Sequence, residues 1–204
     1  IASKKSNVRN PDDLKGKNIS VSGNTFVEYA TDEVMKRACL HPGEVNKPEI
    51  NNIPLRLMML EDGQISASFL PGPATAIALN DGHTALLNTR QMGLRCTGIV
   101  FSEKAITEKD EEIRRFITGY NLGVKYLQTR PQNEWTEILV KEFGLQEKAA
   151  MQIDLPDYRP ATRPSYHDIE KIIAWLKSKG AIPDYYPGEN LVDTTFIPGT
   201  LKPQ

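Results

Sequence analysis

The chain has 204 residues, of which 39% are apolar and 25% are charged, so it can form one or two globular domains with a hydrophobic core. Its 25 Lys and Arg residues nearly balance its 26 Asp and Glu residues. The resulting net charge of -1 argues against nucleic-acid binding, which needs clustered excess base. No apolar stretch approaches the ~20 residues that span a bilayer.

The first half of the chain predicts strands that alternate with helices. Short apolar and β-branched runs predict strands over 19–21, 49–53, 65–70 and 85–88. Helical spacing of apolar residues, a proline suited to a first helical turn and an Ala-rich run predict helices over about 26–39, 55–61 and 74–79. Such alternation is typical of parallel β-α-β units.

After a further predicted strand over 97–101, the chain becomes mostly helical. Amphipathic spacing predicts a long helix that Pro131 stops, followed by helices over 133–143, 146–154 and about 165–180. The Pro-rich, aromatic tail over 182–204 predicts ordered irregular chain packed on a surface. We place a boundary between an α/β lobe and the helical region near residues 95–97.

The clearest candidate site is the turn Ser22-Gly23-Asn24-Thr25 with Phe26, where a predicted strand ends and a helix begins. The first helical turn leaves backbone N–H groups without partners, and these favour an anion or a carbonyl oxygen. Ser22, Asn24 and Thr25 add side-chain donors, and Gly23 lets a ligand approach the backbone. The alternative, that Ser22 or Asn24 simply caps the helix, stays open.

A second candidate is Phe69-Leu70-Pro71-Gly72, which again joins a predicted strand to a helix. Ligands in open α/β sheets bind beyond the carboxyl ends of strands, so two such loops would face the same side. Phe69 could stack on a ligand, and the amides after Pro71 could bind it. An ordinary β-α turn with Phe69 in the core is the alternative.

The search for catalytic and metal-binding sets is negative. His41, His83 and His167 lack metal-ligand spacing, and we interpret each as a turn or cap residue without a catalytic role. The common hydrolase, phosphate-loop, metalloprotease and dinucleotide motifs are absent. Cys39 and Cys96 are too few for a disulfide framework, so we predict buried free thiols, with a single bridge left open. We therefore predict no cofactor and no metal.

The order of these segments resembles the periplasmic binding proteins of the alkanesulfonate, taurine, nitrate and thiamine-precursor group. Residues 13–21 resemble the family's DLKGKKIAV segment, and residues 22–29 resemble its loop and helix start. Residues 58–67 resemble a further segment, and residues 191–193 resemble the C-terminal signature. The resemblance covers residues 8–197.

Two positions depart from the family pattern. Ser66 stands where the family usually has Asp, and Gly72 stands where it usually has an acidic residue. Because of these departures, the identity of the ligand stays open among sulfonate, nitrate, pyrimidine-like and peptide-like compounds.

The resemblance implies an α/β fold of the type II periplasmic binding proteins, with two lobes joined by a hinge. Residues 12–96 would form lobe two, and residues 1–11 and 97–204 would form the largely helical remainder of lobe one. The N-terminal part of lobe one would be missing from this chain. The resemblance also implies a monomer that is not an enzyme and that binds neither a cofactor nor nucleic acid.

The function implied by the resemblance is capture of a small anionic or polar organic ligand in an interlobe cleft. The protein would deliver this ligand to the membrane permease domains of an ABC importer. It would act in the periplasm or as an extracellular membrane-anchored lipoprotein, with its signal segment outside this chain. The implied ligand-binding residues are Ser22, Gly23, Asn24, Thr25, Phe26, Phe69, Leu70, Pro71 and Gly72.

Two other function classes stay open. One is an enzyme of thiamine-precursor or menaquinone biosynthesis on the same fold, which requires clustered His, Cys or acidic groups in the cleft. The other is a sensory ligand-binding domain, which requires a fused effector. Neither requirement is met by a pattern in these residues.

Overall fold

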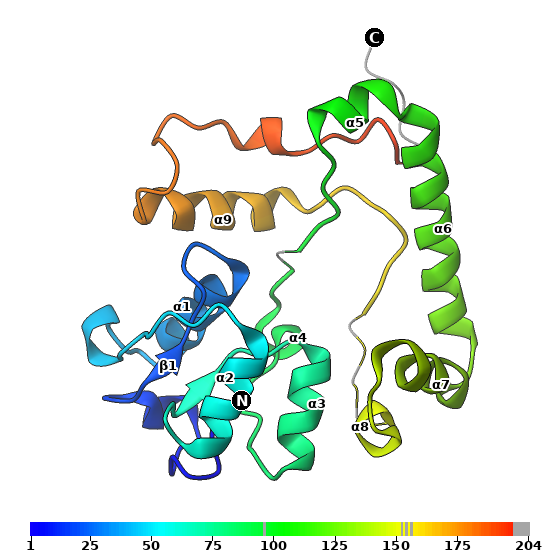
Figure 1. Cartoon of the computed structure of the whole chain (residues 1–204). Coiled ribbons are helices and arrows are strands. Elements are labelled where there is room, and N and C mark those ends of the chain that lie inside the picture. Colours follow the sequence, from blue (N-terminus) through cyan, green and yellow to red (C-terminus); the bar gives the residue numbers. More distant parts are fainter. Residues whose placement is uncertain (96, 152, 154, 156, 198–204) are drawn as a thin grey trace. The chain divides into compact units, whose positions relative to one another are not determined.

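The computed structural model describes residues 1–95, 97–151, 153, 155 and 157–197. The chain divides into two compact units, each built from two segments (Figure 1). Unit 1 comprises Ile1–Leu94 and Thr136–Pro156, and unit 2 comprises Arg95–Trp135 and Asp157–Gln204.

This division differs from the predicted lobes in two places. Residues 1–11 belong to unit 1 rather than to the helical part, because Ala2 forms antiparallel bridges with Ala67 and Thr84. Residues 136–156 also join unit 1. The boundary at residues 94 and 95 lies next to the predicted one. Both differences depend on contacts between segments far apart in sequence, which local patterns do not encode.

Unit 1 contains a small parallel sheet formed by β1 (Ile19–Ser20) and β2 (Ala67–Ser68). Ile19 pairs with Ala67, and Ser20 pairs with Ser68. Isolated parallel bridges extend the pairing, from Asn18 to Asn46 and from Val21 to Glu49. The parallel arrangement agrees with the predicted β-α-β units.

Three predicted strands of unit 1 are shorter than expected or absent. The strand predicted over 65–70 is reduced to β2, and that predicted over 49–53 is reduced to an isolated bridge at Glu49. Over 85–88 no strand forms, and the pairing occurs at Thr84 instead. A β-prone run becomes a strand only where a neighbouring segment supplies hydrogen bonds, and here the pairing segments are short.

The helices of unit 1 begin and end at recognisable local signals. Asn52 caps α2, which has a proline in its first turn, and Gly63 closes it in the left-handed conformation with φ of 76°. Helix α7 begins in unit 2 and continues into unit 1. The helices that lie wholly in unit 1 are α1 (Phe26–Arg37), α2 (Ile53–Asp62), α3 (Gly72–Asn80), α4 (Thr89–Met92) and α8 (Glu147–Met151).

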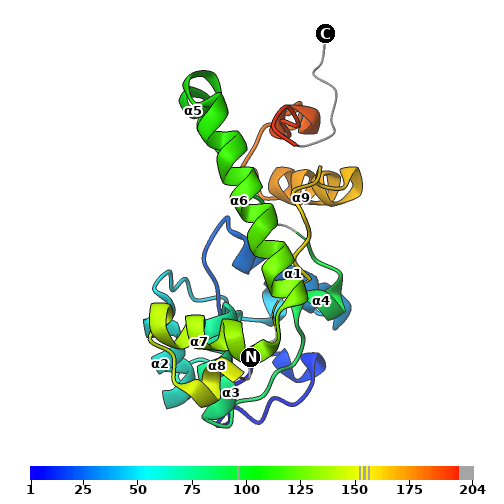
Figure 2. The ribbon, with the colours of Figure 1, turned by 90° about the vertical axis from the view of Figure 1, so that its right-hand side faces the viewer.

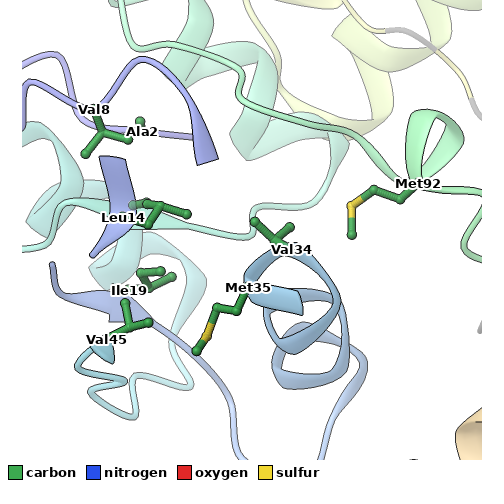
Figure 3. Packing of buried hydrophobic residues seen from close by; sticks show 9 residues of the cluster. Ala2, Val8, Leu14, Ile19, Val34, Met35, Val45 and Met92 are labelled. Atoms are coloured by element: carbon green, nitrogen blue, oxygen red, sulfur yellow. The ribbon is translucent and has the colours of Figure 1, made fainter. Parts of the chain in front are cut away.

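Two apolar clusters hold unit 1 together. The first joins Ile19 of β1 to Val34 and Met35 of α1, as Figure 3 shows. The second joins Leu60 of α2 to Ala78 of α3, and α8 lies beside α3 (Figure 2). Leu60 is fully buried, and burial of such a side chain contributes about 1.5–3 kcal/mol.

Unit 2 is helical, with its long helix α6 amphipathic as predicted. A cluster of Ile113 and Ile117 from α6 with Phe196 from the tail forms its core. The helices that begin in unit 2 are α5 (Glu103–Glu108), α6 (Asp110–Thr129), α7 (Gln132–Phe143) and α9 (Tyr166–Ser178), with a short 3₁₀ helix at Gly188–Leu191.

The strand predicted over 97–101 is wrong. This segment carries no strand, and Val100 is 89% exposed. No described segment pairs with it, so its β-branched residues find no sheet to join. Phe101 instead packs beside the α6 cluster, with its ring 5.7 Å from that of Phe116 in an edge-to-face arrangement.

Candidate ligand-binding site

The structure brings the two predicted loops to the same end of the sheet. β1 and β2 run parallel, so the loop after each strand lies at their common carboxyl end. Phe26, at the start of α1, and Phe69, after β2, meet there with ring centroids 5.9 Å apart and planes at 79°. This edge-to-face contact joins the two loops.

The cap of helix α1 is Thr25 rather than Ser22 or Asn24. Its hydroxyl accepts a hydrogen bond from the Val27 amide at 3.2 Å and donates one to the Ser22 carbonyl at 2.8 Å. Asn24 takes φ of 55°, a left-handed conformation that asparagine tolerates better than most residues. Thr25 and Asn24 therefore shape the turn.

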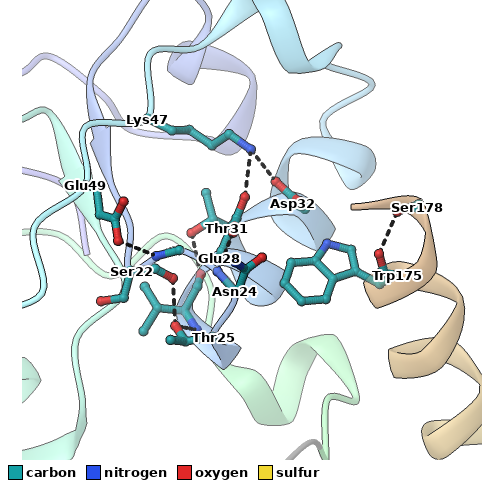
Figure 4. Close-up of polar contacts among 12 residues, drawn as sticks. Ser22, Asn24, Thr25, Glu28, Thr31, Asp32, Lys47, Glu49, Trp175 and Ser178 are labelled. Carbon is teal, nitrogen blue, oxygen red and sulfur yellow. Dashed lines mark hydrogen bonds and ion pairs between the residues drawn. The ribbon is translucent and has the colours of Figure 1, made fainter. Parts of the chain in front are cut away.

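The amides of Gly23 and Asn24, which precede the first helical turn, bind carboxylate oxygens of the chain itself. The Gly23 amide donates to Glu49 Oε1 at 3.3 Å, and the Asn24 amide donates to Glu28 Oε2 at 2.8 Å (Figure 4). The Glu28 carboxylate also lies 3.7 Å from Lys47 Nζ, which contacts Asp32 at 2.8 Å. In this structure both amides of the turn therefore have carboxylate partners within the chain.

The carboxylates of Glu28 and Glu49 differ in how firmly they are held at these amides. Glu28 is held between the Asn24 amide and Lys47, and its side chain is only 14% exposed. Glu49 is exposed. Besides the Gly23 amide, its carboxylate accepts a hydrogen bond from the Asn51 side-chain amide at 3.3 Å. The Gly23 amide is thus the more accessible of the two donors to an incoming anion.

A buried arginine that the sequence analysis missed connects the loops. Arg56 of α2 donates from Nη2 to Ser22 Oγ at 2.8 Å and from Nη1 to the Phe69 carbonyl at 3.0 Å. Its Nε donates to the Ile50 carbonyl at 2.9 Å. The signal for it was a single charged residue within the apolar run Ile53–Leu60.

The loop after β2 divides between core and surface. Leu70 is buried in the α2–α3 cluster, and its carbonyl accepts a hydrogen bond from Thr75 Oγ1 at 2.9 Å. Phe69 is half-buried and packs on the first core cluster. This agrees in part with the alternative interpretation, which placed Phe69 in the core. Pro71 and Gly72 are exposed at the start of α3.

The structure tests the predictions for two reactive residues, His83 and Cys39. His83 is buried, with Nδ1 accepting a hydrogen bond from the Lys4 amide at 3.1 Å, and burial lowers the pKa of its imidazole. Cys39 is a free thiol but exposed, so its predicted burial is wrong, because the chain turns there with φ of 51°. Cys96 lies outside the described residues.

Within residues 1–95, 97–151, 153, 155 and 157–197, no group of three or more His, Cys, Asp and Glu side chains is arranged to hold a metal ion. In those same ranges, no helix combines the length and apolar character needed to cross a membrane.

Comparison with known proteins places the chain in a family. Residues 1–134 match the family model described as NMT1/THI5 like. Comparison of the sequence with curated proteins gave no match.

Several solved structures are similar. The periplasmic aliphatic sulphonate-binding protein SsuA from Escherichia coli matches with a TM-score of 0.73 and 12% identity, over 96% of this chain and 68% of that protein. The alkanesulfonate-binding SsuA from Xanthomonas axonopodis pv. citri, bound to MOPS, matches with a TM-score of 0.74 and 19% identity, over 90% and 64%. A structure from Methylobacillus flagellatus KT, described as a periplasmic sulfonate-binding protein SsuA, matches with a TM-score of 0.65 and 16% identity, over 96% of this chain and 62% of that protein.

These similarities confirm the predicted fold, although this chain corresponds to only part of each matched structure. The chain spans 64% and 62% of the second and third of these structures, slightly less than two thirds. The chain therefore belongs to the NMT1/THI5-like family and has part of the α/β fold of the type II periplasmic solute-binding proteins of ABC transporters.

Proposed function

We propose that this chain is the ligand-binding part of an extracytoplasmic solute-binding protein that serves an ABC importer. The observation that carries this proposal is the convergence of two loops, Ser22–Thr25 and Phe69–Gly72, at the carboxyl end of one parallel strand pair. Unit 1 supplies both loops. This is the position at which open α/β sheets bind small ligands.

The bonds of the first loop support an anionic ligand. Carboxylate oxygens of Glu49 and Glu28 already occupy the amides of Gly23 and Asn24. A sulfonate or nitrate oxygen offers the same chemistry, so the anionic end of the ligand would replace the exposed Glu49 carboxylate. The rings of Phe26 and Phe69 lie beside this turn and would contact an organic tail.

The ligand class is proposed in order of support. Sulfonates come first, because similar structures are named as binding aliphatic sulphonates or alkanesulfonates. Nitrate and pyrimidine-like compounds follow from the family resemblance. In the whole protein, which we propose acts as a monomer in the periplasm or as a membrane-anchored lipoprotein, the bound ligand would pass to permease domains.

Calorimetric titration of the purified protein tests the proposal. The probes are ethanesulfonate, taurine, nitrate and an aminopyrimidine, after native mass spectrometry has identified any co-purified compound. We expect one-to-one binding of at least one anion. Binding of none of these probes, or chemical turnover of a bound compound, would count against the proposal, and turnover would favour the enzyme alternative.

A paired variant locates the site. Asn24→Ala with Thr25→Ala removes the turn and the cap of α1, and it should weaken anion binding by about tenfold or more. Asn88→Ala is the matched control, since Asn88 caps α4 through the same type of bond to the Gln91 amide. If both variants bind like the parent protein, the turn is not the site.

A further inference from the structure

Arg56 is the one Lys, Arg, Asp or Glu residue that is buried among the described residues, and it is 2% exposed. Its three recorded hydrogen bonds go to neutral oxygens, those of Ser22, Ile50 and Phe69. No carboxylate is recorded in contact with it in the part of the chain that the structure describes. Buried arginines are usually paired with an acid, so this charge is unusual.

The position of these acceptors gives Arg56 a mechanical role. Ser22 begins the first ligand loop, Phe69 begins the second, and Ile50 follows the segment that pairs with Val21. The planar guanidinium binds all three with a fixed geometry that a flexible ammonium does not reproduce. One side chain from α2 therefore bonds the first residue of both loops.

The charge of Arg56 gives it a second role. Desolvation by burial lowers the pKa of its guanidinium from the usual value, yet arginine stays protonated in proteins. Its positive charge therefore lies within hydrogen-bond distance of Ser22, the first residue of the turn. The carboxylates of Glu49 and Glu28 accept hydrogen bonds from the Gly23 and Asn24 amides of the same turn. A buried charge in a low-dielectric setting acts on a ligand over a longer range than an exposed one.

We propose that Arg56 is a positioning residue that fixes the spacing of the two ligand loops, and that its buried charge selects an anionic over a neutral head group. This inference rests on the proposed function. It assigns a role to a residue outside the loops and predicts what discriminates between ligands of equal shape.

The experiment compares Arg56→Gln and Arg56→Lys with the parent protein. The two probes are the anion identified in the titration and its uncharged isostere, for example an alkanesulfonate and the alkylsulfonamide of equal length. Arg37→Gln is the matched control, because Arg37 also bonds a backbone carbonyl in unit 1, that of Met92, but is exposed. Circular dichroism and thermal melts show which variants fold.

The affinity ratio of the two probes separates charge from structure. We expect Arg56→Gln to reduce the preference for the anion by about tenfold or more. Arg56→Lys should keep the preference within a few fold while weakening both probes, because the loops lose their fixed spacing. Arg37→Gln should change neither quantity. A folded Arg56→Gln protein with the parent preference overturns the inference.

Two further outcomes are distinguishable. If Arg56→Gln does not fold, Arg56→Lys decides: weakened binding of both probes supports the inference, and unchanged affinity for both overturns it. If the parent protein binds no anion of the panel, the proposed function fails, and this inference fails with it for that separate reason.

Discussion

Ser20 and Ser68 face each other in register on β1 and β2, and the Ser20 hydroxyl donates a 2.8 Å hydrogen bond to Ser68 Oγ in the interior of unit 1. Both residues are buried, and Ser68 Oγ in turn lies 3.3 Å from the Phe69 carbonyl. Ser68 directly precedes Phe69 of the second ligand loop, and Ser20 lies two residues before Ser22 of the first. The pair ties the strands together by side chains as well as by the backbone.

The Ser20–Ser68 pair predicts a non-additive effect on stability. Ser68→Ala leaves the Ser20 hydroxyl buried without its acceptor and should lower the free energy of unfolding by about 1–3 kcal/mol. Adding Ser20→Ala removes the unpaired group, so the double variant should be less destabilised than Ser68→Ala alone. Urea unfolding followed by circular dichroism measures both, and strictly additive losses would contradict the reading.

Asn24 predicts an unusual tolerance of glycine. Its φ of 55° is a conformation that glycine takes freely and a β-branched residue resists. Asn24→Gly should leave the free energy of unfolding within a few tenths of a kcal/mol of the parent, while Asn24→Val should lower it by about 1–2 kcal/mol. Equal stability of the two variants in urea would show that the turn can take another conformation.

Glu49 predicts a variant that binds its ligand more tightly. The carboxylate occupies the Gly23 amide, which is the donor that an anionic ligand would need. Glu49→Gln removes the negative charge that competes with the ligand and repels it, so anion affinity should rise about threefold or more. Calorimetric titration checks this, with Glu61→Gln in the last turn of α2 as the control. Unchanged or weaker binding by Glu49→Gln would contradict a ligand at that amide.

His83 predicts a loss of stability in mild acid. Burial, and next the positive charge of Lys4, lower the pKa of its imidazole, although Asp81 acts in the opposite direction. Its Nε2 has no hydrogen-bond partner among the described residues. Since the unfolded chain titrates near the ordinary value of about 6.5, it binds a proton that the folded protein does not.

The protein should therefore become less stable as the pH is lowered. The contribution of neutral His83 is fully present at pH 7.5 and is lost progressively as pH falls through about 6.5, down to the lower pKa of the folded state. Urea midpoints at pH 7.5, 6.5 and 5.5 measure it. His83→Gln, which cannot titrate, should show a shallower fall over this range. A variant with the same pH dependence as the parent would assign the effect to other groups.

Local chemistry predicted the longer helices, whereas the short helices α4 and α5 lie outside the predicted ranges. Ser165 caps α9 by accepting a bond from the Asp168 amide at 3.1 Å, and Gly180 follows that helix with φ of 65°, in agreement with the helix predicted over about 165–180. Such signals act within a few residues, so they can be recognised without a fold. The strand at residues 97–101 failed for the opposite reason, since it needed a partner elsewhere in the chain.

The sequence by itself determined the fold family, the helix ends, and the two loops that follow β1 and β2. Only the tertiary structure decided which residues contact those loops. Glu49 accepts a hydrogen bond from the Gly23 amide, Arg56 donates to Ser22 and Phe69, and Leu70 is buried in the core. Capping and periodicity are properties of neighbouring residues, whereas these contacts join residues 26, 34 and 13 positions apart. Such pairings depend on how the elements pack, and packing is fixed only when the whole unit has folded.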